Sequence, residues 1–200
     1  MRVLVVYCHP NPKSFNAAIR DLVVERAKAA GAEVQVLDLY AEGFDPLLSL
    51  AEFEIYETVP DNTSPVARHV EAIRWCDTLI FVYPTWWYAH PAMLKGWLDR
   101  VLLPGVAFEM PDGGDIRPTL THITRLGVFT TCGASWWLTR FVGFPGRRVI
   151  LRGIRILCAK RCRTAFLAHY LMDASTPKTR DKHLRRVHST MDRLMAGSLR

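Results

Sequence analysis

Short apolar runs alternate along the chain with segments whose apolar residues recur at helical spacing. Continuous or alternating apolar runs predict five strands, at 3–7, 33–39, 78–83, 122–131 and 163–171. Helical spacing predicts helices at 17–30, 50–57, 64–76, 91–103 and 144–158, the last interrupted at Pro145-Gly146, and a final helix that begins at 175–177. This alternation predicts an α/β fold: a doubly wound five-stranded parallel sheet with helices on both faces.

The remaining segments do not suggest a second domain. Residues 106–118 contain Asp112-Gly113-Gly114-Asp115, a turn signal that predicts a hairpin beside the main sheet. The chain has no repeat, low-complexity tract or linker, and 200 residues are enough for one substantial core, so we expect residues 1–200 to form a single domain. No apolar run approaches the length of a membrane span, and the N-terminal run lacks the length and cleavage site of a secretory signal.

The cysteines and the charges bear on compartment and partners. The five cysteines include no Cys-x-x-Cys pair and no neighbours at metal-ligand spacing, so we expect no metal and a reduced, cytoplasmic compartment. Residues 140–200 carry 15 Lys and Arg against three acids, whereas residues 1–139 carry 11 against 16. The basic part suits an anionic partner or is a solvated surface. It contains no nucleic-acid recognition motif, so we expect no nucleic-acid partner.

The first of three candidate loops, 8–16, runs from the first strand into a helix. Free N–H groups and the positive end of the helix dipole therefore lie near 14–17, a geometry that binds phosphate. Lys13 adds charge, and Ser14 and Asn16 either bind phosphate oxygens or act as ordinary helix caps. The loop is neither a Walker loop nor a Gly-x-Gly-x-x-Gly turn.

The second and third loops carry aromatic residues. The second, 84–91, has three adjacent aromatics between prolines, which favours a flat conjugated ligand such as a flavin over burial in the core. The third, 130–137, offers small residues for close backbone approach and two tryptophans that cover a flat ligand or pack under the following helix. Because ligands of open α/β sheets bind at the carboxyl ends of strands, we expect the three loops to form one site.

Five segments resemble the flavodoxin-like NAD(P)H:quinone oxidoreductase family, which includes DT-diaphorase, the modulator-of-drug-activity reductases and the ancillary subunits of bacterial potassium efflux systems. The segments are His9-Pro-Asn-Pro-Lys-Ser-Phe-Asn16, Asp38-Leu39-Tyr40, Pro84-Thr-Trp-Trp-Tyr88, Pro91-Ala-Met-Leu-Lys-Gly-Trp97 and Thr130-Thr-Cys-Gly133. They occur in order and at matching spacing, and the resemblance weakens after Ser135. It implies a flavodoxin-like sheet with strand order 2-1-3-4-5.

The resemblance also implies how the loops meet a flavin: the first at its phosphate or pyrophosphate, the second at its ring, and the third at the pyrimidine side of the ring. Together with the candidates taken from the residues themselves, the expected cofactor-binding residues are His9, Lys13, Ser14, Phe15, Asn16, Thr85, Trp86, Trp87, Tyr88, Thr130, Thr131, Cys132, Gly133 and Trp136. The family is typically homodimeric with its active site at the subunit interface, so we expect a homodimer with 95–100 as a contact region.

Three features depart from the DT-diaphorase branch. That branch has a tyrosine and then a histidine after the third loop, which steady charge on the reduced flavin. Here Trp136 and Trp137 stand near the tyrosine position, and no histidine lies between His122 and His169, so no catalytic residue is assigned. A long C-terminal extension is also missing, so we expect a different outer wall, and Cys132 replaces a loop glycine.

The function implied is that of a flavin-dependent enzyme. It takes electrons from NADPH or NADH and passes two of them, by ping-pong hydride transfer, to a quinone or similar small-molecule acceptor. The Ser-Phe-Asn form of the first loop favours FAD, whereas the short chain favours FMN. Arg140, Arg147 and Arg148 either attract the nicotinamide phosphates or only keep the surface soluble.

Two other functions remain as alternatives. One is a regulatory flavoprotein subunit bound to a membrane transporter or other partner, with peripheral contact through the basic amphipathic segment 149–161. We favour packing of that segment against the sheet or a dimer mate. The other is a one-electron flavodoxin-type carrier, but such carriers are usually strongly acidic.

Overall fold

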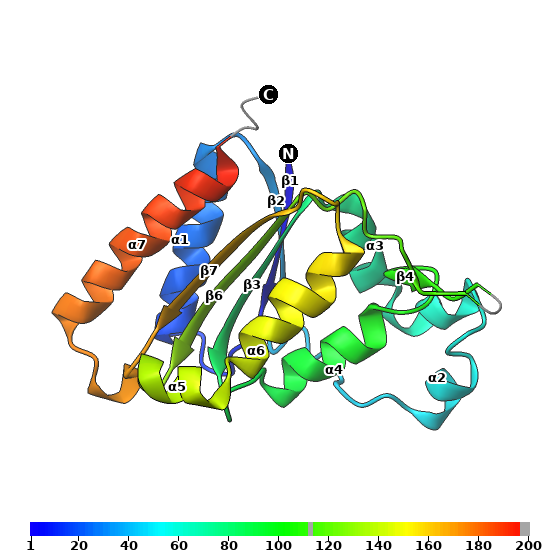
Figure 1. The fold of residues 1–200 in the computed structure, drawn as a ribbon, viewed down its shortest axis with the longest axis horizontal. Helices are drawn as coiled ribbons and strands as arrows, with labels where there is room; N and C mark the ends of the chain where they lie inside the picture. Colours follow the sequence, from blue (N-terminus) through cyan, green and yellow to red (C-terminus); the bar gives the residue numbers. More distant parts are fainter. Residues whose placement is uncertain (112–113, 197–200) are drawn as a thin grey trace.

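The five apolar runs form the central sheet. The computed structural model describes residues 1–111 and 114–196, and its sheet consists of β1 (Arg2–Tyr7), β2 (Glu33–Asp38), β3 (Thr78–Thr85), β6 (Arg125–Cys132) and β7 (Arg163–His169). All neighbouring strands are parallel, in the order β2-β1-β3-β6-β7 (Figure 1). Counted over these five strands, this is the predicted order 2-1-3-4-5, so the predicted fold class is confirmed.

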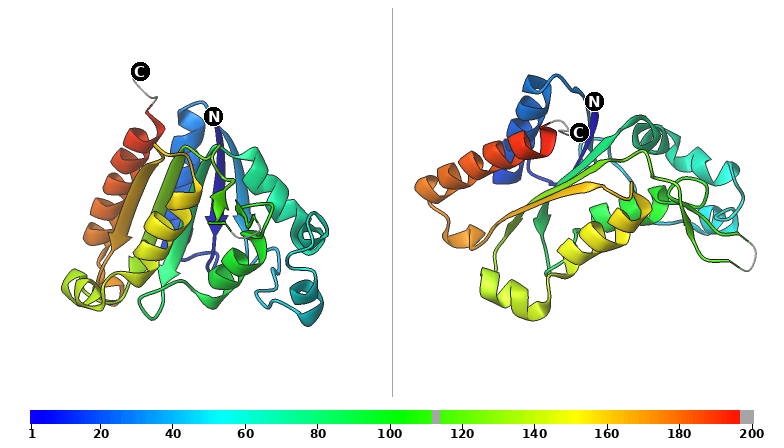
Figure 2. Two further views of the ribbon diagram at one scale, coloured as in Figure 1. Left: turned by 45° about the vertical axis from the view of Figure 1, so that its right-hand side comes forward. Right: turned by 45° about the horizontal axis from the view of Figure 1, so that its top comes forward.

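Helices cover both faces of the sheet (Figures 1 and 2). One face packs against α1 (Phe15–Ala29) and α7 (Pro177–Met195), and the other against α3 (Ala67–Trp75), α4 (Ala92–Val101) and the segment from α6 (Pro145–Arg148) through the π-helical turn Val149–Ile154. Successive side chains of β1 alternate between these two cores, with Val5 on the α1 side and Leu4 on the α3 side. Because both faces are buried, the strand has to be apolar throughout.

Shorter elements lie around the sheet. They are α2 (Leu50–Glu54), the 3-10 turns Asp61–Val66, Arg155–Leu157 and Met172–Ala174, the strands β4 (Phe108–Glu109) and β5 (Arg117–Pro118), and α5 (Trp136–Val142). β4 and β5 pair antiparallel, as the predicted hairpin requires, although Asp112 and Gly113 of its turn signal lie outside the described residues. Within the described part of the chain, none of the helices combines the length and apolar character needed to cross a bilayer.

The segment between β6 and β7 differs from the sequence prediction. A separate helix, α5, follows Ser135, whose hydroxyl accepts a hydrogen bond from the Leu138 N–H at 3.2 Å, and it ends at Gly143 with φ at 92°. Pro145 then begins the next helix instead of interrupting one, because a proline at the first helical position loses no intrahelical hydrogen bond. The prediction that Pro145-Gly146 interrupts a helix over 144–158 is therefore wrong, because the helix begins at Pro145.

Other predicted bounds move by a few residues. β6 begins at Arg125 rather than at 122, β7 ends at His169 rather than at 171, and the first turn of the predicted helix over 64–76 belongs to the 3-10 turn Asp61–Val66. The basic segment 149–161 packs Ile150, Ile154 and Cys158 into the core beside α3 and α4. These apolar side chains of the segment are thus buried against the sheet, which is the packing predicted for it.

Candidate cofactor site

A cavity of about 690 Å³ lies at the carboxyl ends of the parallel strands. Its walls come from the segments that follow β1, β3, β6 and β7, namely His9, Ser14, Phe15, Asn16, Pro84, Thr85, Trp86, Trp87, Tyr88, Thr131, Cys132, Gly133, Ala134, Met172 and Asp173. The three predicted loops therefore meet in one place. Both the location and the volume are typical of a cofactor site.

The start of α1 forms one end of the cavity. Ser14 caps the helix: its hydroxyl accepts a hydrogen bond from the Ala17 N–H at 3.1 Å and lies 3.2 Å from the hydroxyl of Tyr7. The first amides of a helix have no intrahelical acceptor, and the helix dipole is positive at this end. Because Phe15 and Asn16 line the cavity, this end suits a phosphate.

His9 presents a neutral imidazole to the same end. Its Nδ1 accepts a hydrogen bond from the Asn11 N–H at 2.9 Å, and burial lowers the pKa of the ring. A neutral histidine whose Nδ1 accepts carries its proton on Nε2, as assigned from this hydrogen bond. His9 can therefore donate a hydrogen bond from Nε2 to an anionic or carbonyl oxygen in the cavity.

Asn16 leaves one polar atom of the cavity wall without a partner. Its amide nitrogen donates to the Thr131 hydroxyl at 2.9 Å, joining the first loop to the third, while the residue is only 3 % exposed. Its Oδ1 is buried and has no hydrogen-bond partner among the described residues. An unsatisfied buried acceptor costs about 1–3 kcal/mol, so this oxygen is suited to a hydroxyl or N–H group of a bound molecule.

The aromatic loop makes a tight reverse turn. The Trp86 N–H donates to the Ala89 carbonyl at 3.2 Å and the Ala89 N–H donates back at 3.0 Å, while Trp87 and Tyr88 have φ of 49° and 62°. Two central residues in the left-handed region define the turn type that glycine and asparagine usually occupy. The turn projects Trp87 into solvent, with 94 % of the residue exposed.

The third loop contributes mainly backbone. The buried hydroxyl of Thr130 lies 2.9 Å from the Thr85 hydroxyl, so Thr130 ties β6 to the end of β3 behind the cavity wall. The sulfur of Cys132 lies 3.7 Å from the Thr139 hydroxyl on α5. Its side chain thus packs toward α5, and a cysteine is accommodated at this position without filling the cavity.

The structure places the predicted site residues in two groups. All of them line the cavity except Lys13, Thr130 and Trp136. Lys13 is exposed, and Thr130 lies behind Thr85. Trp136 lies on α5, where its ring centroid is 6.2 Å from that of Phe144. Direct contact of the lining residues with a flavin stays a prediction.

Sequence analysis missed Met172 and Asp173, which follow β7 and complete the cavity. Asp173 approaches the third loop so closely that a Cβ added to Gly133 would lie 2.7 Å from Asp173 Oδ2. The loop after β7 carries no motif. The available signal was topological: it follows the carboxyl end of the fifth predicted strand, where ligands of such sheets bind.

Comparisons with known proteins identify the family and the fold to which the chain is similar. The model of a family with the flavodoxin-like fold matches residues 1–191. Rat ribosyldihydronicotinamide dehydrogenase [quinone] is 35 % identical over 158 residues, which cover 70 % of this chain and 67 % of the rat protein. An NAD(P)H:quinone oxidoreductase from Methanothermobacter marburgensis has a similar structure, with a TM-score of 0.83, 27 % identity and 98 % of both chains covered.

A structural neighbour of lower sequence identity has a similar fold. An FMN-dependent NADH-azoreductase from Bacillus anthracis, solved in complex with FMN, aligns with a TM-score of 0.75 over 97 % of this chain and 99 % of its own. Its sequence identity is 15 %, so the similarity concerns the fold alone.

Proposed function

This chain belongs to the family of proteins with the flavodoxin-like fold, and we propose that it is a flavin-dependent NAD(P)H oxidoreductase acting on a quinone or similar acceptor. The proposal rests on one observation: the N-terminus of α1, the aromatic turn and the ends of β3 and β6 meet in the same cavity. These are the three surfaces that a phosphate, a flat ring and the polar edge of that ring require. The orphaned Asn16 Oδ1 fits a ribityl hydroxyl between phosphate and ring.

Each part of the cavity has a binding task in this proposal. The α1 amides, His9 Nε2 and the Ser14 cap hold the phosphate end. The Trp86–Tyr88 turn supports one side of the ring system. The backbone of Thr131–Gly133, fixed by parallel pairing up to Cys132, forms the wall against which the pyrimidine edge of the ring would lie. A bound flavin supplies the hydride chemistry, first with a reduced nicotinamide and then, in a ping-pong sequence, with the acceptor.

We propose FAD as the resident flavin and leave NADPH and NADH as alternative donors. The support for FAD is the resemblance of the His9–Asn16 loop to FAD-binding members of the family. FMN is the alternative, and it is the flavin bound in the azoreductase neighbour. Arg147 stacks over Phe166 at 5.4 Å and Arg140 over Trp136 at 5.7 Å, outside the cavity lining, so any help to the nicotinamide phosphates is long-range.

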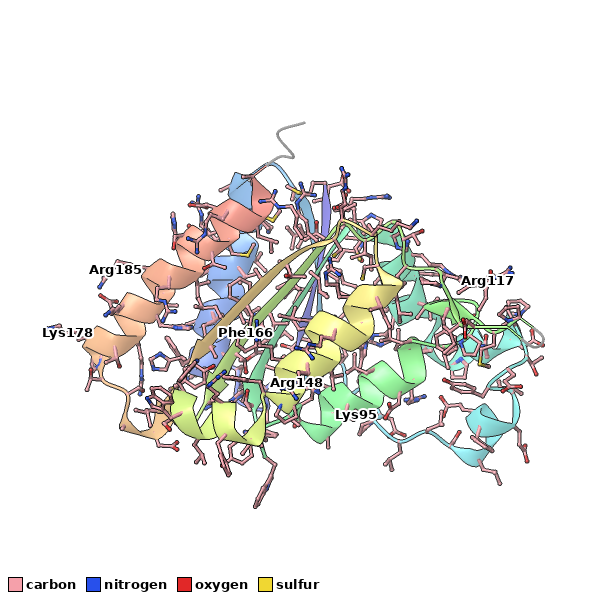
Figure 3. The ribbon with its side chains drawn as sticks, viewed as in Figure 1. Lys95, Arg117, Arg148, Phe166, Lys178 and Arg185 are labelled. Atoms are coloured by element: carbon pink, nitrogen blue, oxygen red, sulfur yellow. The ribbon has the colours of Figure 1, made fainter. Side chains whose placement is uncertain are left out.

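We also propose a homodimer that covers the cavity mouth. Besides Trp87, the exposed side of α5 carries Trp137 and Phe141, which are 74 % and 88 % exposed. Large apolar side chains exposed together mark interaction sites. We expect the doubly substituted Trp137→Ser/Phe141→Ser protein to sediment as a monomer and the unaltered protein as a dimer. A matched change on α7, Lys178→Ser/Arg185→Ser, alters exposed side chains on the outer side of that helix (Figure 3) and should leave the dimer intact.

The deciding experiment is to purify the protein, record its visible spectrum and identify the released chromophore by mass. FAD or FMN absorbance, with turnover of NADPH or NADH in the presence of menadione, is the expected result. A colourless protein that takes up neither flavin would contradict the proposal. The regulatory alternative is separated by the same assay combined with liposome sedimentation: flavin binding and sedimentation without turnover would favour it.

A further inference from the structure

β7 is the last strand of the sheet, and its outer edge is open along the described part of the chain. The Arg163 N–H donates to the Thr124 carbonyl at 2.9 Å, so the backbone polar groups of residues 163, 165 and 167 face β6. Because these groups alternate sides along a strand, the N–H and C=O groups of Thr164, Phe166 and Ala168 face outward. Such an edge is a template for another strand.

A hollow lies on each side of this edge. The first, of about 620 Å³, lies between β7 and α7, and the second, of about 480 Å³, lies between β7 and the α5–α6 segment. Thr164, Phe166, Leu167 and Arg186 line both, so the two hollows meet along the outer edge of the strand. Figure 3 shows Phe166, a residue of β7, near the helix that follows α5.

Both hollows are basic. Arg163, Arg186 and Arg193 line the first, and Arg140, Arg147 and Arg186 line the second. No acidic residue is among the described residues that line either hollow. Among the ion pairs within 1–111 and 114–196, none involves these five arginines. The edge therefore combines unpaired backbone groups with unneutralised positive charge.

We propose that the outer edge of β7 is a docking site for an extended acidic segment of a partner protein, which adds to the sheet as a further strand. Successive side chains of a strand point to opposite faces, so those of the added segment enter the two hollows in turn. There their carboxylates meet arginine guanidinium groups, which form strong charge-assisted hydrogen bonds with carboxylates.

The charge also argues against self-association at this edge. A second copy paired β7 to β7 would bring the two sets of arginines together without intervening acids. The docking site shares no lining residue with the cofactor cavity, so peptide binding can be measured separately from flavin binding.

Two fluorescent peptides of about eight residues, a usual strand length, test the proposal. One repeats Glu-Glu-Val-Val and the other Lys-Lys-Val-Val, so that each face of the added strand carries charged side chains, and both are titrated by fluorescence anisotropy at fixed ionic strength. We expect saturable binding of the Glu peptide alone. Thr164→Pro removes one outward N–H from a strand edge that tolerates proline and should weaken binding at least about tenfold. Thr164→Val keeps the N–H and should bind as the unaltered protein does.

Hydrogen exchange supplies a second readout that does not depend on a variant. Bound Glu peptide should slow exchange of the amides of Thr164 and Phe166, whereas those of Ala165 and Leu167, which face β6, should change little. Arg186→Gln should weaken binding because this residue lines both hollows. Equal binding of the Lys peptide, unchanged binding by the Thr164→Pro protein, or displacement of the Glu peptide by inorganic phosphate alone would overturn the proposal.

Discussion

Trp87 and Tyr88 have a left-handed backbone conformation, which is energetically unfavourable for residues other than glycine. Each left-handed residue of this kind costs about 1–2 kcal/mol, and two stand side by side in the aromatic turn. Backbone hydrogen bonds hold the turn from both sides, since the Gly146 N–H donates to the Tyr88 carbonyl at 3.2 Å and Trp86 and Ala89 bond each other. Strain of this kind concentrates at binding sites. We infer that the turn is kept for its aromatic surface.

Trp87→Gly should separate the strain from the function. Glycine adopts the observed φ without a steric penalty, and little buried surface is lost from a residue that is 94 % exposed. We expect the free energy of unfolding in urea to rise by up to about 1 kcal/mol, while the flavin dissociation constant increases. Trp87→Ala is the control, because it removes the indole but keeps the Cβ. A gain in stability with alanine as large as with glycine would contradict the strain argument.

Asn16 is the residue at which a single substitution should weaken flavin binding. Its buried Oδ1 has no hydrogen-bond partner within 1–111 and 114–196, and its amide nitrogen donates to Thr131. We expect Asn16→Ala to raise the dissociation constant of the flavin about tenfold or more, the effect of one or two lost hydrogen bonds. Titration of the apoprotein followed by flavin fluorescence measures it. Lys13→Gln changes an exposed residue of the same loop and should change the constant no more than about threefold.

At this scale the sequence predicts position along the chain better than the direction of a side chain. Lys13, Thr130 and Trp136 stand in the right loops but do not line the cavity, because Lys13 is exposed, Thr130 bonds to Thr85 and Trp136 packs on Phe144. Asp173 lies in the cavity wall without any local motif. Which way a side chain points depends on neighbours distant in sequence, and a single sequence does not supply them.

At the scale of elements, α4 explains why glycine and tryptophan follow each other in the Pro91–Trp97 segment. A Cβ on Gly96 would lie 2.1 Å from the Pro46 carbonyl oxygen, so the loop after β2 rests directly on the helix backbone. Trp97 is fully buried next to it and donates its indole N–H to His69 Nδ1 at 3.1 Å. This part of the resemblance therefore reflects packing of α4 rather than contact with a ligand.

Gly96→Ala should consequently destabilise the protein by about 1–3 kcal/mol, because the Pro46 backbone has to move. The urea midpoint measures the change. Gly153→Ala is the matched control: nothing lies within 4 Å of a Cβ added there, and the residue stands in a helical segment. We expect it to be neutral or slightly stabilising, since alanine favours helix. Equal destabilisation by both substitutions would show that glycine at position 96 is not needed for packing.

Elements were predictable where one signal dominates and were missed where two compete. The continuous apolar runs gave all five strands of the sheet, since strands buried on both faces must be apolar. α5 was missed although Ser135 and Gly143 are ordinary start and stop residues for a helix. Adjacent tryptophans in a segment after a strand fit a ligand loop as well as a helix, and only the placement of α5 beside α6 decides between them.

At the scale of the whole molecule, the uneven charge of the sequence becomes a distinct surface. Much of the basic C-terminal part lies on β7, α7 and the α5–α6 segment, at the edge of the sheet opposite β2 (Figure 1). The cofactor cavity opens instead at the carboxyl ends of the strands. Charge composition alone suggested an anionic partner. The structure adds that this charge lies beside an open strand edge, which the sequence reveals only once the strand order is known.

Buried histidines give the folded molecule its expected dependence on pH. Burial lowers the pKa of His69 to about 4, with help from the charges of Arg68 and Arg100, and that of His90 to about 4. Burial, followed by the nearby His169 and Arg186, lowers the pKa of His183 to about 3. In the unfolded chain each ring titrates near its ordinary value of about 6.5. Between these values the unfolded state binds more protons than the folded state.

The histidine contribution to the free energy of unfolding should therefore be fully present above about pH 6.5 and should fall as the pH drops toward 4. Each histidine contributes a slope of up to about 1.4 kcal/mol per pH unit, which urea unfolding at a series of pH values measures. His183→Leu removes one buried ring and should make the dependence shallower by one histidine's share. A free energy of unfolding that stays constant from about pH 7 to about pH 5 would mean that these rings keep ordinary pKa values in the folded protein.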